Sequence, residues 1–290
     1  MAVDGGGLSS ATRGELTALL KGAHLPDTQI HILSAIPRHV GLGSGTMLAM
    51  GVLRAAVLVH GIRVLPSDLG VMSRRGGTSG IGCHAFWLGG FIVDGGQPDV
   101  GQALRPSSAS APRESPPLLI RGPIPAHWRF TLLLPHSGTY VSGMAESTFF
   151  STKTPTIADE CLKAFAALYH AVVPGVLTAD LQLLRNGLRE YQKLGMKKAE
   201  IAAQSPDVRR LLSALSKIPG CAYGMSSFGP LVFAVSDERD NLTSYDIRDA
   251  ANSCGAHVFA HARGRNFGHR INGSKSVDPP TGQSPEIRLA

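Results

Sequence analysis

A glycine-rich turn that opens directly into an apolar helix is the feature that most constrains this chain. The stretch Pro37–Gly61 reads PRHVGLGSGTMLAMGVLRAAVLVHG, and Arg54 is the only charge between Met47 and Val59. The turn has three alternating glycines, Gly41, Gly43 and Gly45. Glycine adopts positive φ without a Cβ penalty, and a helix that starts in such a loop points unpaired N–H groups at an anion. We therefore expect a phosphate or carboxylate here, the alternative being a turn before a core helix with no ligand.

Polar side chains flank this turn. Ser44 and Thr46 are predicted to cap the helix and to contact the anion. Arg38, at the entrance, is either a phosphate clamp or a solvated loop charge. His39 is interpreted as a hydrogen-bonded polar residue rather than a catalytic base.

A second glycine-rich block, SRRGGTSGIG, spans Ser73–Gly82. Arginine can hold a phosphate through two parallel hydrogen bonds, glycines let the backbone approach a ligand, and hydroxyls add donors. This composition favours anion binding over a simple connection. The candidate contacts are Arg75, Gly76, Gly77, Thr78 and Ser79.

Asp94 is the carboxylate best placed in the sequence to meet both loops. It could bind a metal–diphosphate or receive a proton, which makes it the one candidate for a catalytic residue. Alternatively it caps the turn at Gly95–Gly96.

A third block, Gly220–Ser236, places Ser226 and Ser227 in a turn between two extended segments. Ser142 and Glu146, after the strand predicted at 127–135, complete the candidate substrate contacts.

The bulk numbers narrow the function classes. A net charge of +7 favours anionic partners, but the basic residues are scattered without a dense run, so we expect a small phosphorylated anion and no nucleic acid. We expect no membrane partner, since we predict no apolar run of membrane-spanning length. The four cysteines lie far apart, which argues against a metal site and fits reduced thiols in the cytoplasm. The oligomeric state is left open, with a homodimer as one option.

Composition divides the chain at a proline- and serine-rich stretch. We predict an N-terminal domain at 1–103, a linker at 104–126, a C-terminal α+β domain at 127–270 and a disordered tail at 271–290. Helices are predicted at 12–21, 47–59, 66–72, 81–88, 157–172, 178–194, 206–216 and 244–253, and strands at 28–36, 89–93, 127–135 and 257–262. Ser205 is the expected N-cap of the helix that begins with Pro206.

Pro-x3-Gly-Leu-Gly-Ser before a small-residue helix resembles the phosphate-binding motif of the GHMP kinase superfamily. Four blocks in order resemble one branch of it, the β-ribofuranosylaminobenzene 5′-phosphate synthases. The blocks are GLGSGT from Gly41, RGGTSGIG from Arg75, GGFIVDGG from Gly89 and GMSSFGP from Gly224. The resemblance implies a two-domain α+β fold, with an N-terminal part like ribosomal protein S5 domain 2 and a ferredoxin-like C-terminal part.

The same resemblance implies a function. The family condenses 4-aminobenzoate with phosphoribosyl diphosphate, releasing CO₂ and diphosphate, in tetrahydromethanopterin biosynthesis. Mg²⁺ is expected on the diphosphate, mostly through substrate oxygens and without a dedicated protein site. Members open with a further strand and a Pro-x-Arg motif that this sequence does not show, so the N-terminal domain is expected to be truncated at its start.

Two other functions stay open. An ATP-dependent small-molecule kinase would use the same fold, but Gly45 and Ser226–Ser227 depart from the kinase pattern. Kinases usually carry a second serine and an alanine at Gly45 and Thr46, and glycines at the third block. A non-catalytic ligand-binding remnant of the family is the third hypothesis.

Overall fold

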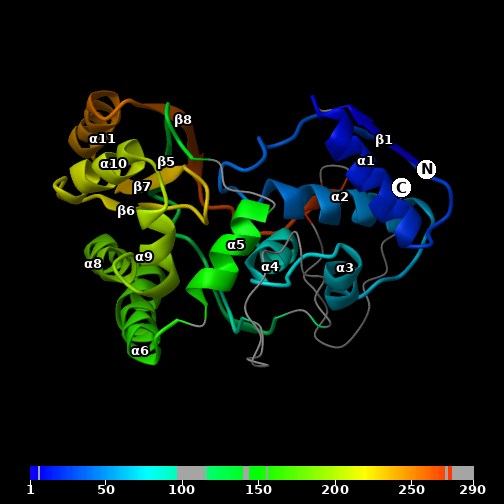
Figure 1. Ribbon diagram of the computed structural model, residues 1–290, viewed down its shortest axis with the longest axis horizontal. Helices are drawn as coiled ribbons and strands as arrows, with labels where there is room; N and C mark the ends of the chain where they lie inside the picture. The colour runs from blue at the N-terminus through cyan, green and yellow to red at the C-terminus, as the bar shows by residue number, and fades with distance from the viewer. Residues whose placement is uncertain are drawn as a thin grey trace. The chain divides into compact units, whose positions relative to one another are not determined.

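The computed structural model describes residues 1–5, 7–96, 114, 116–139, 144–154, 156–271 and 274–275 (Figure 1). The chain forms two compact units. Unit 1 comprises 1–38, 43–121 and 267–290, and unit 2 comprises 39–42 and 122–266. The chain passes from one unit to the other and back within the glycine-rich turn.

Unit 1 is built mainly of helices around one apolar helix. Its elements are β1 (Ala2–Gly5), α1 (Ser10–Gly22), β2 (Gln29–Ile32), α2 (Ser44–Val59), α3 (Pro66–Met72), α4 (Ile81–Leu88), β3 (Phe91–Asp94), β4 (Leu118–Gly122), β9 (Arg270–Ile271) and β10 (Ser274–Lys275). β1 pairs in parallel with β2, β3 pairs with β4, and β9 pairs antiparallel with β10.

The core of unit 1 forms around α2. Leu53, Ala56 and Val57 of this helix are fully buried and pack with Leu20 of α1 and Leu69 of α3. Spacings of three and four residues place these side chains on one helical face. This contact holds the start of α2, where the glycine-rich turn ends, on a rigid element.

Arg54, the one charged residue of α2, contacts an aromatic ring and a histidine of the C-terminal segment that belongs to unit 1. The Arg54 guanidinium lies 5.1 Å from the Trp87 ring centroid, and its Nε donates to His269 Nε2 at 3.3 Å. The His269 ring stacks on Phe86 at 4.5 Å between centroids. Burial lowers the pKa of Arg54 from its ordinary value, and a cation over a ring offsets part of that cost.

Unit 2 is a sheet covered by helices. Its elements are β5 (Trp128–Pro135), α5 (Met144–Lys153), α6 (Ala158–Ala167), a π-helical turn (Leu168–Val172), α7 (Val173–Leu177), α8 (Leu181–Tyr191), α9 (Gly195–Ala202), α10 (Pro206–Ser216), β6 (Ala222–Met225), β7 (Val232–Asp237), α11 (Asn241–Ser253) and β8 (Ala256–Arg263).

The sheet of unit 2 has the strand order β6-β7-β5-β8, and every neighbouring pair is antiparallel. Two β-helix-β passages in sequence with this order are the ferredoxin-like arrangement. The predicted ferredoxin-like fold of the C-terminal part is confirmed. Side chains of α10 and α11 pack on the sheet in one core that includes Leu133, Leu211 and Ile247, all fully buried.

Side-chain caps fix where several helices of unit 2 begin. Ser205 Oγ accepts from the Val208 N–H, as predicted for the helix opening at Pro206. Asp240 caps α11 in the same way, by accepting from the Thr243 N–H at 2.9 Å. With this cap, α11 begins at Asn241, three residues before the start predicted at Ser244.

One described helical stretch, Ala158–Leu177, is long and apolar enough to cross a membrane by length and composition, contrary to the prediction that no such run exists. It is interrupted by the π-helical turn and packs closely on α8. A Cβ added at Gly187 of α8 would lie 2.8 Å from the Ala171 and Val172 side chains. Only 22% of its most apolar window is buried, so this packing covers a small part of the helix.

The units divide inside the predicted linker, between Arg121 and Gly122, but differ from the predicted ranges in two places. The segment 39–42 belongs to unit 2, and the chain from Phe267 returns to unit 1. Within the range predicted as a tail, the described residues are Ile271, Ser274 and Lys275, which take part in the pairing of β9 with β10. The first part of the predicted linker, 104–113, and residue 115 lie outside the described residues, as do residues 97–103 before it.

We predict that Leu133→Ala lowers the free energy of unfolding by about 2–5 kcal/mol, because it leaves a cavity in a fully buried core. Leu242→Ala is the matched control, since Leu242 is 81% exposed and its change should stay within about 0.5 kcal/mol. Denaturant unfolding measures both, and equal losses would contradict this assignment of the core.

The four cysteines are free, and burial sets their reactivity. Desolvation raises the pKa of Cys83 to about 11 and that of Cys221 to about 12. Both thiols therefore stay protonated near neutral pH, where only a thiolate is nucleophilic.

We predict that Cys161, which is half-buried, reacts with a thiol reagent in the native protein at pH 8. Cys83 and Cys221 should react at least about a hundredfold more slowly until denaturant is added. Mass spectrometry after timed labelling locates the modified residues, and rapid native labelling of Cys221 would contradict its place in the sheet core.

Candidate functional site

The start of α2 has backbone donors and, among the described residues, no side-chain cap. Gly43 is the N-cap residue, with φ 66°. The predicted capping by Ser44 or Thr46 is therefore wrong, because Ser44 is already the first helical residue and is buried. An uncapped helix start leaves N–H groups and the positive end of the helix dipole available to an anion.

Arg75 lies against this helix start. A Cβ built on Gly45 would be 3.4 Å from both Nη1 and Nη2 of Arg75, so the guanidinium packs on the bare Cα of the glycine. Arg74 instead is exposed at the end of α3, with φ 55° and its N–H donating to Val71 O. Of the two adjacent arginines, Arg75 is the one brought to the glycine-rich turn.

The second glycine-rich block is tied to the end of β3. Ser79 Oγ donates to Asp94 Oδ2 at 2.9 Å and also accepts from the Ile81 N–H at 3.3 Å. Asp94 Oδ1 accepts from the Gly96 N–H at 3.0 Å. Asp94 thus caps the glycine turn, as one of the two readings had it, and also holds Ser79.

Two other predicted contacts face protein in unit 1. Thr46 packs on α4, since a Cβ added at Gly82 would lie 2.8 Å from Thr46 Cγ2. Arg38 Nη1 donates to Thr12 Oγ1 and to Glu15 Oε2, each at 2.8 Å. Arg38 is thus bound to α1 through this nitrogen. Of the remaining residues in the second block, Gly76 and Gly77 are buried and Thr78 is half-buried.

The first part of the glycine-rich turn is held within unit 2. The backbone of Gly41 has φ 100°, and a Cβ there would overlap Ser226 O. Ser226 Oγ donates to Gly41 O at 2.8 Å, and the Leu231 N–H donates to Val40 O at 3.3 Å. A Cβ at Gly229 would overlap the Val40 backbone. Glycines at both positions permit this backbone-to-backbone contact.

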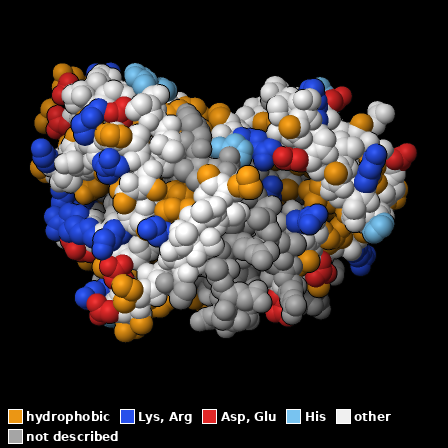
Figure 2. All heavy atoms as spheres, in the orientation of Figure 1, with side chains coloured by type: hydrophobic (Ala, Val, Ile, Leu, Met, Phe, Trp, Pro, Cys, Tyr) orange, Lys and Arg blue, Asp and Glu red, His pale blue; other side chains and the backbone are white. Residues whose placement is uncertain are grey.

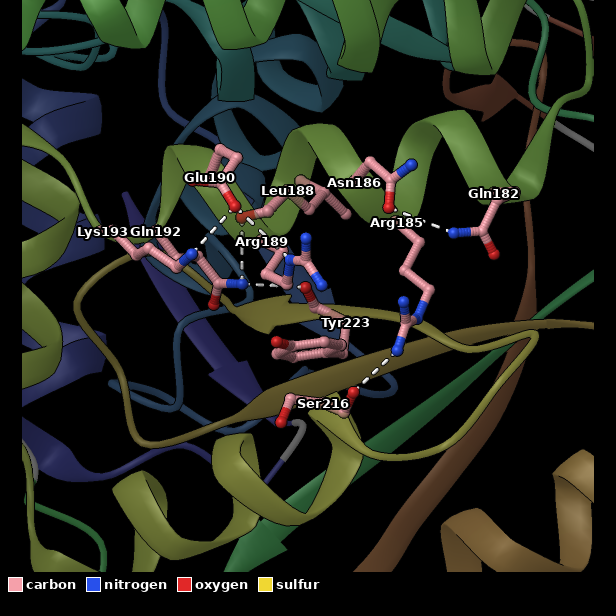
Figure 3. A network of polar contacts seen from close by, with 10 residues as sticks. All are labelled: Gln182, Arg185, Asn186, Leu188, Arg189, Glu190, Gln192, Lys193, Ser216 and Tyr223. Atoms are coloured by element: carbon pink, nitrogen blue, oxygen red, sulfur yellow. Dashed lines mark hydrogen bonds and ion pairs between the residues drawn. The ribbon is translucent and has the colours of Figure 1, made fainter.

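Side chains from the end of α8, from α9 and from the segment before α10 form hydrogen bonds with the backbone of this turn and of strand β6. Gln192 Nε2 donates to Tyr223 O at 3.0 Å (Figure 3). Its Oε1 accepts from the Met225 N–H at 3.1 Å, and the two bonds together hold strand β6. Lys197 Nζ donates to Ser227 O at 2.8 Å, and Gln204 Nε2 donates to Phe228 O at 3.1 Å. Ser227 has φ 51° and an exposed side chain.

Helix α5 brings the predicted Glu146 into the same unit. The Phe149 ring of this helix lies 4.3 Å from the Phe228 ring in the third block. Glu146 is half-buried in the first turn of α5. Ser142 lies outside the described residues, so its predicted role stays a prediction.

Sequence reasoning did not select Gly229 or Lys197, although both support the third block. Gly229 stands in the quoted GMSSFGP motif, and its glycine was the available signal. No feature of the sequence indicated Lys197, because this residue lies on a separate helix, α9. Lys197 also forms an ion pair with Glu200, whose pKa burial raises from its ordinary value despite that partner.

Several basic side chains around α8 and α9 pair with carboxylates. On the face in Figure 2, Lys and Arg side chains gather over the part of unit 2 where Figure 1 labels α8 and α9. Lys193 pairs with Glu190 at 2.8 Å, and Lys198 pairs with Glu160 at 3.0 Å. Such pairs reduce the net charge of this surface.

Comparison with known proteins identifies the class. The family model for the GHMP kinase N-terminal domain matches residues 7–90, and that for the GHMP kinase C-terminal domain matches 164–258. Homoserine kinase from Cytophaga hutchinsonii has a TM-score of 0.61 at 16% identity, covering 91% of this chain and 82% of that one. Phosphomevalonate kinase from Streptococcus pneumoniae has a TM-score of 0.61 at 12% identity, covering 87% and 80%. The chain has the GHMP kinase fold, as predicted.

Curated relatives are closer in sequence and share one name, β-ribofuranosylphenol 5′-phosphate synthase. That of Methanocaldococcus jannaschii is 33% identical over 83% of this chain and 73% of its own length. That of Archaeoglobus fulgidus is 32% identical over 76% and 68%. The chain belongs to this synthase family, which confirms the family indicated by the four blocks. Its match to the relative from Methanothermobacter thermautotrophicus, 33% identical over 73% of this chain, spans 65% of that protein's length.

We predict that Gly41→Ala lowers the free energy of unfolding by about 1–2 kcal/mol or more, because a Cβ is strained at this φ and meets Ser226 O. Gly51→Ala, at a helical position in α2 with open space around it, is the control and should be neutral or stabilising. Thermal and denaturant unfolding compare the two variants. A Gly41→Ala protein as stable as the Gly51→Ala protein would refute the close contact.

Proposed function

We propose that this chain is a ribosyltransferase that joins phosphoribosyl diphosphate to an aromatic acid and releases CO₂ and diphosphate. Family membership supports a transferase, because the relatives are named as synthases of a ribofuranosylated aromatic phosphate. The observation that carries the proposal is the uncapped start of α2 with the Arg75 guanidinium packed on Gly45.

That arrangement suits a diphosphate leaving group. Backbone N–H groups, the helix dipole and a guanidinium all favour negative charge at one place. Charge grows on the diphosphate as its bond to the ribose C1 breaks, so donors fixed in advance stabilise the transition state more than the ground state.

The reaction needs little acid or base from the protein. The ring carbon that carries the carboxylate forms a bond to ribose C1 while the C1–O bond electrons leave with the diphosphate. The bond from ring to carboxylate then breaks, its electrons restore the aromatic ring, and CO₂ departs. No net proton transfer is required. This chemistry fits the fact that Asp94, the catalytic candidate, has both carboxylate oxygens engaged by Ser79 and Gly96.

The acceptor is proposed as a benzoate with an electron-donating group opposite the carboxylate. The resemblance carried by the four sequence blocks implies 4-aminobenzoate as the acceptor. The relatives' name instead specifies a phenol product, which corresponds to 4-hydroxybenzoate as acceptor. Both groups push electrons to the attacking carbon, so chemistry alone does not choose. We propose 4-aminobenzoate, and with it a role in tetrahydromethanopterin biosynthesis, and we test it against 4-hydroxybenzoate.

Mg²⁺ is proposed to arrive with the diphosphate. In the described part of the chain no three His, Cys, Asp or Glu side chains lie together as a metal site. Mg²⁺ commonly takes one carboxylate plus phosphate and water oxygens, and Asp94 could supply that carboxylate. When bound, the ion would offset diphosphate charge. The free thiols fit the proposed cytoplasmic location.

A kinase activity is the second candidate, since the structural neighbours are kinases. Two observations weigh against it. The guanidinium of Arg75 occupies the space beside Gly45, where kinases carry a second serine side chain. The Ser226 hydroxyl, at a position where kinases have glycine, is used to hold Gly41.

The direct test incubates the protein with phosphoribosyl diphosphate, Mg²⁺ and either acid labelled in its carboxyl carbon, and follows labelled CO₂. Release that requires both substrates supports the transferase, and faster release from one acid names the acceptor. Absence of release with both acids, together with phosphate transfer from ATP to a small molecule, would establish the kinase instead. Absence of both activities would favour a non-catalytic binding protein.

We predict that Arg75→Ala weakens binding of phosphoribosyl diphosphate about tenfold or more, as expected for a lost charge-assisted hydrogen bond. Arg74→Ala is the matched control, because that neighbouring side chain is exposed at the end of α3 and should leave affinity nearly unchanged. Calorimetric titration measures both. Equal affinities for the two variants would remove Arg75 from the site.

We also predict that Ser44→Ala weakens binding of the same ligand, by less than Arg75→Ala, since it removes a neutral hydroxyl at the first residue of α2. The same titration measures it. Ser67→Ala, at the start of α3, serves as the serine control, and an affinity for Ser44→Ala equal to that of this control would exclude a role for the hydroxyl.

A further inference from the structure

Unit 2 has an open pocket of about 360 Å³ at one end of its sheet, lined by Arg129, His261, Ala262 and Arg263. None of these residues belongs to the three glycine-rich blocks. The volume falls in the range of small-molecule sites, which are commonly a few hundred Å³. The lining is strongly basic, with two arginines and one histidine.

Strand register places the basic groups together. Arg129 of β5 lies directly opposite Arg263 of β8, and Thr131 lies opposite His261. Residues two apart on a strand share a face, so the two guanidiniums and the imidazole project from the same side of the sheet. Like charges directly opposite one another on neighbouring strands are destabilising. An anion bound between them would remove that repulsion.

The two arginines differ in their partners. Arg263 Nη2 donates to Glu238 Oε2 at 2.5 Å, an exposed pair that offsets only part of the charge of that guanidinium. The Arg129 side chain is half-buried, and within the described residues no hydrogen bond or ion pair engages its guanidinium. A half-buried, unpaired guanidinium retains unused donors and a charge that an anion would neutralise.

Neighbouring polar groups extend the site. His261 Nδ1 is 3.2 Å from Thr131 Oγ1, a contact that fixes the imidazole and leaves Nε2 directed elsewhere. Ser236, opposite Arg129 on β7, is fully buried, and its hydroxyl finds no partner among the described residues. At this end of the sheet, the Arg129 guanidinium and the Ser236 hydroxyl therefore have hydrogen-bonding capacity that the described residues do not fill.

We propose that this pocket binds the phosphate group of a small phosphorylated molecule, at a site separate from the diphosphate cradle. Both arginine and histidine can bind carboxylate as well, but a planar carboxylate offers only two oxygens. A tetrahedral phosphate presents three oxygens in different directions and can meet Arg129, His261 and Arg263 together. The volume leaves room for the rest of a small metabolite.

The test measures binding of radiolabelled inorganic phosphate by equilibrium dialysis at constant ionic strength. It uses the full chain carrying Arg75→Ala, so that the proposed cradle contributes less. We expect saturable binding that weakens about tenfold or more when Arg129→Gln is added. Arg263→Gln should weaken it as well. Arg248→Gln, which removes an arginine of α11 that packs on Tyr245, is the control and should bind as the parent does.

Circular dichroism and melting confirm that each variant is folded, and His261→Asn provides an independent variant should Arg129→Gln fail. Phosphate binding that is absent from the parent, or equal in the Arg129, Arg263 and His261 variants and the control, overturns the proposal. Neither result bears on the transferase, which is tested by CO₂ release at a different set of residues.

Discussion

The backbone of Gly41 meets the turn at Ser226–Gly229 at a distance that leaves no room for a side chain on either glycine. This contact fixes the first part of the glycine-rich turn in unit 2, and the chain then enters unit 1, where Gly43 turns with positive φ into α2. The contact at Gly41 requires glycine and the positive φ at Gly43 favours it, so both glycines follow from the path of the backbone.

The remaining contacts support the two parts of that loop. In unit 2, Gln192, Lys197 and Gln204 bind the backbone on either side of the turn. In unit 1, the buried apolar face of α2 holds the helix start, and Arg75 packs against it. Within unit 1, a helix start held by a buried core can present its N–H groups in a fixed geometry, and fixed donors are what stabilisation of a leaving diphosphate requires. The hydroxyl of Ser226, which is a predicted ligand contact, instead donates to the Gly41 carbonyl oxygen.

Local patterns predicted the elements well where one short stretch determines them. Ser205 before Pro206 located α10, and the apolar run after the glycine-rich turn located α2, since such signals lie within a few residues. The partners of individual side chains were harder to predict from the sequence than the helices and strands were. The contact of Gly41 with Ser226 spans 185 residues and depends on the fold of both segments. Arg38 was a phosphate candidate on composition, yet its Nη1 binds Thr12 and Glu15, and only the folded position of α1 reveals this.

The central claim is that the start of α2 holds the diphosphate through its backbone. The most direct measurement is the amide NMR spectrum of ¹⁵N-labelled protein titrated with Mg²⁺ and inorganic diphosphate. The account predicts large, saturable shifts of the Ser44 and Gly45 N–H signals, with little change at Asn252 near the far end of α11. Unchanged Ser44 and Gly45 signals, while other amides respond to the same titration, would place the anion elsewhere and contradict the account.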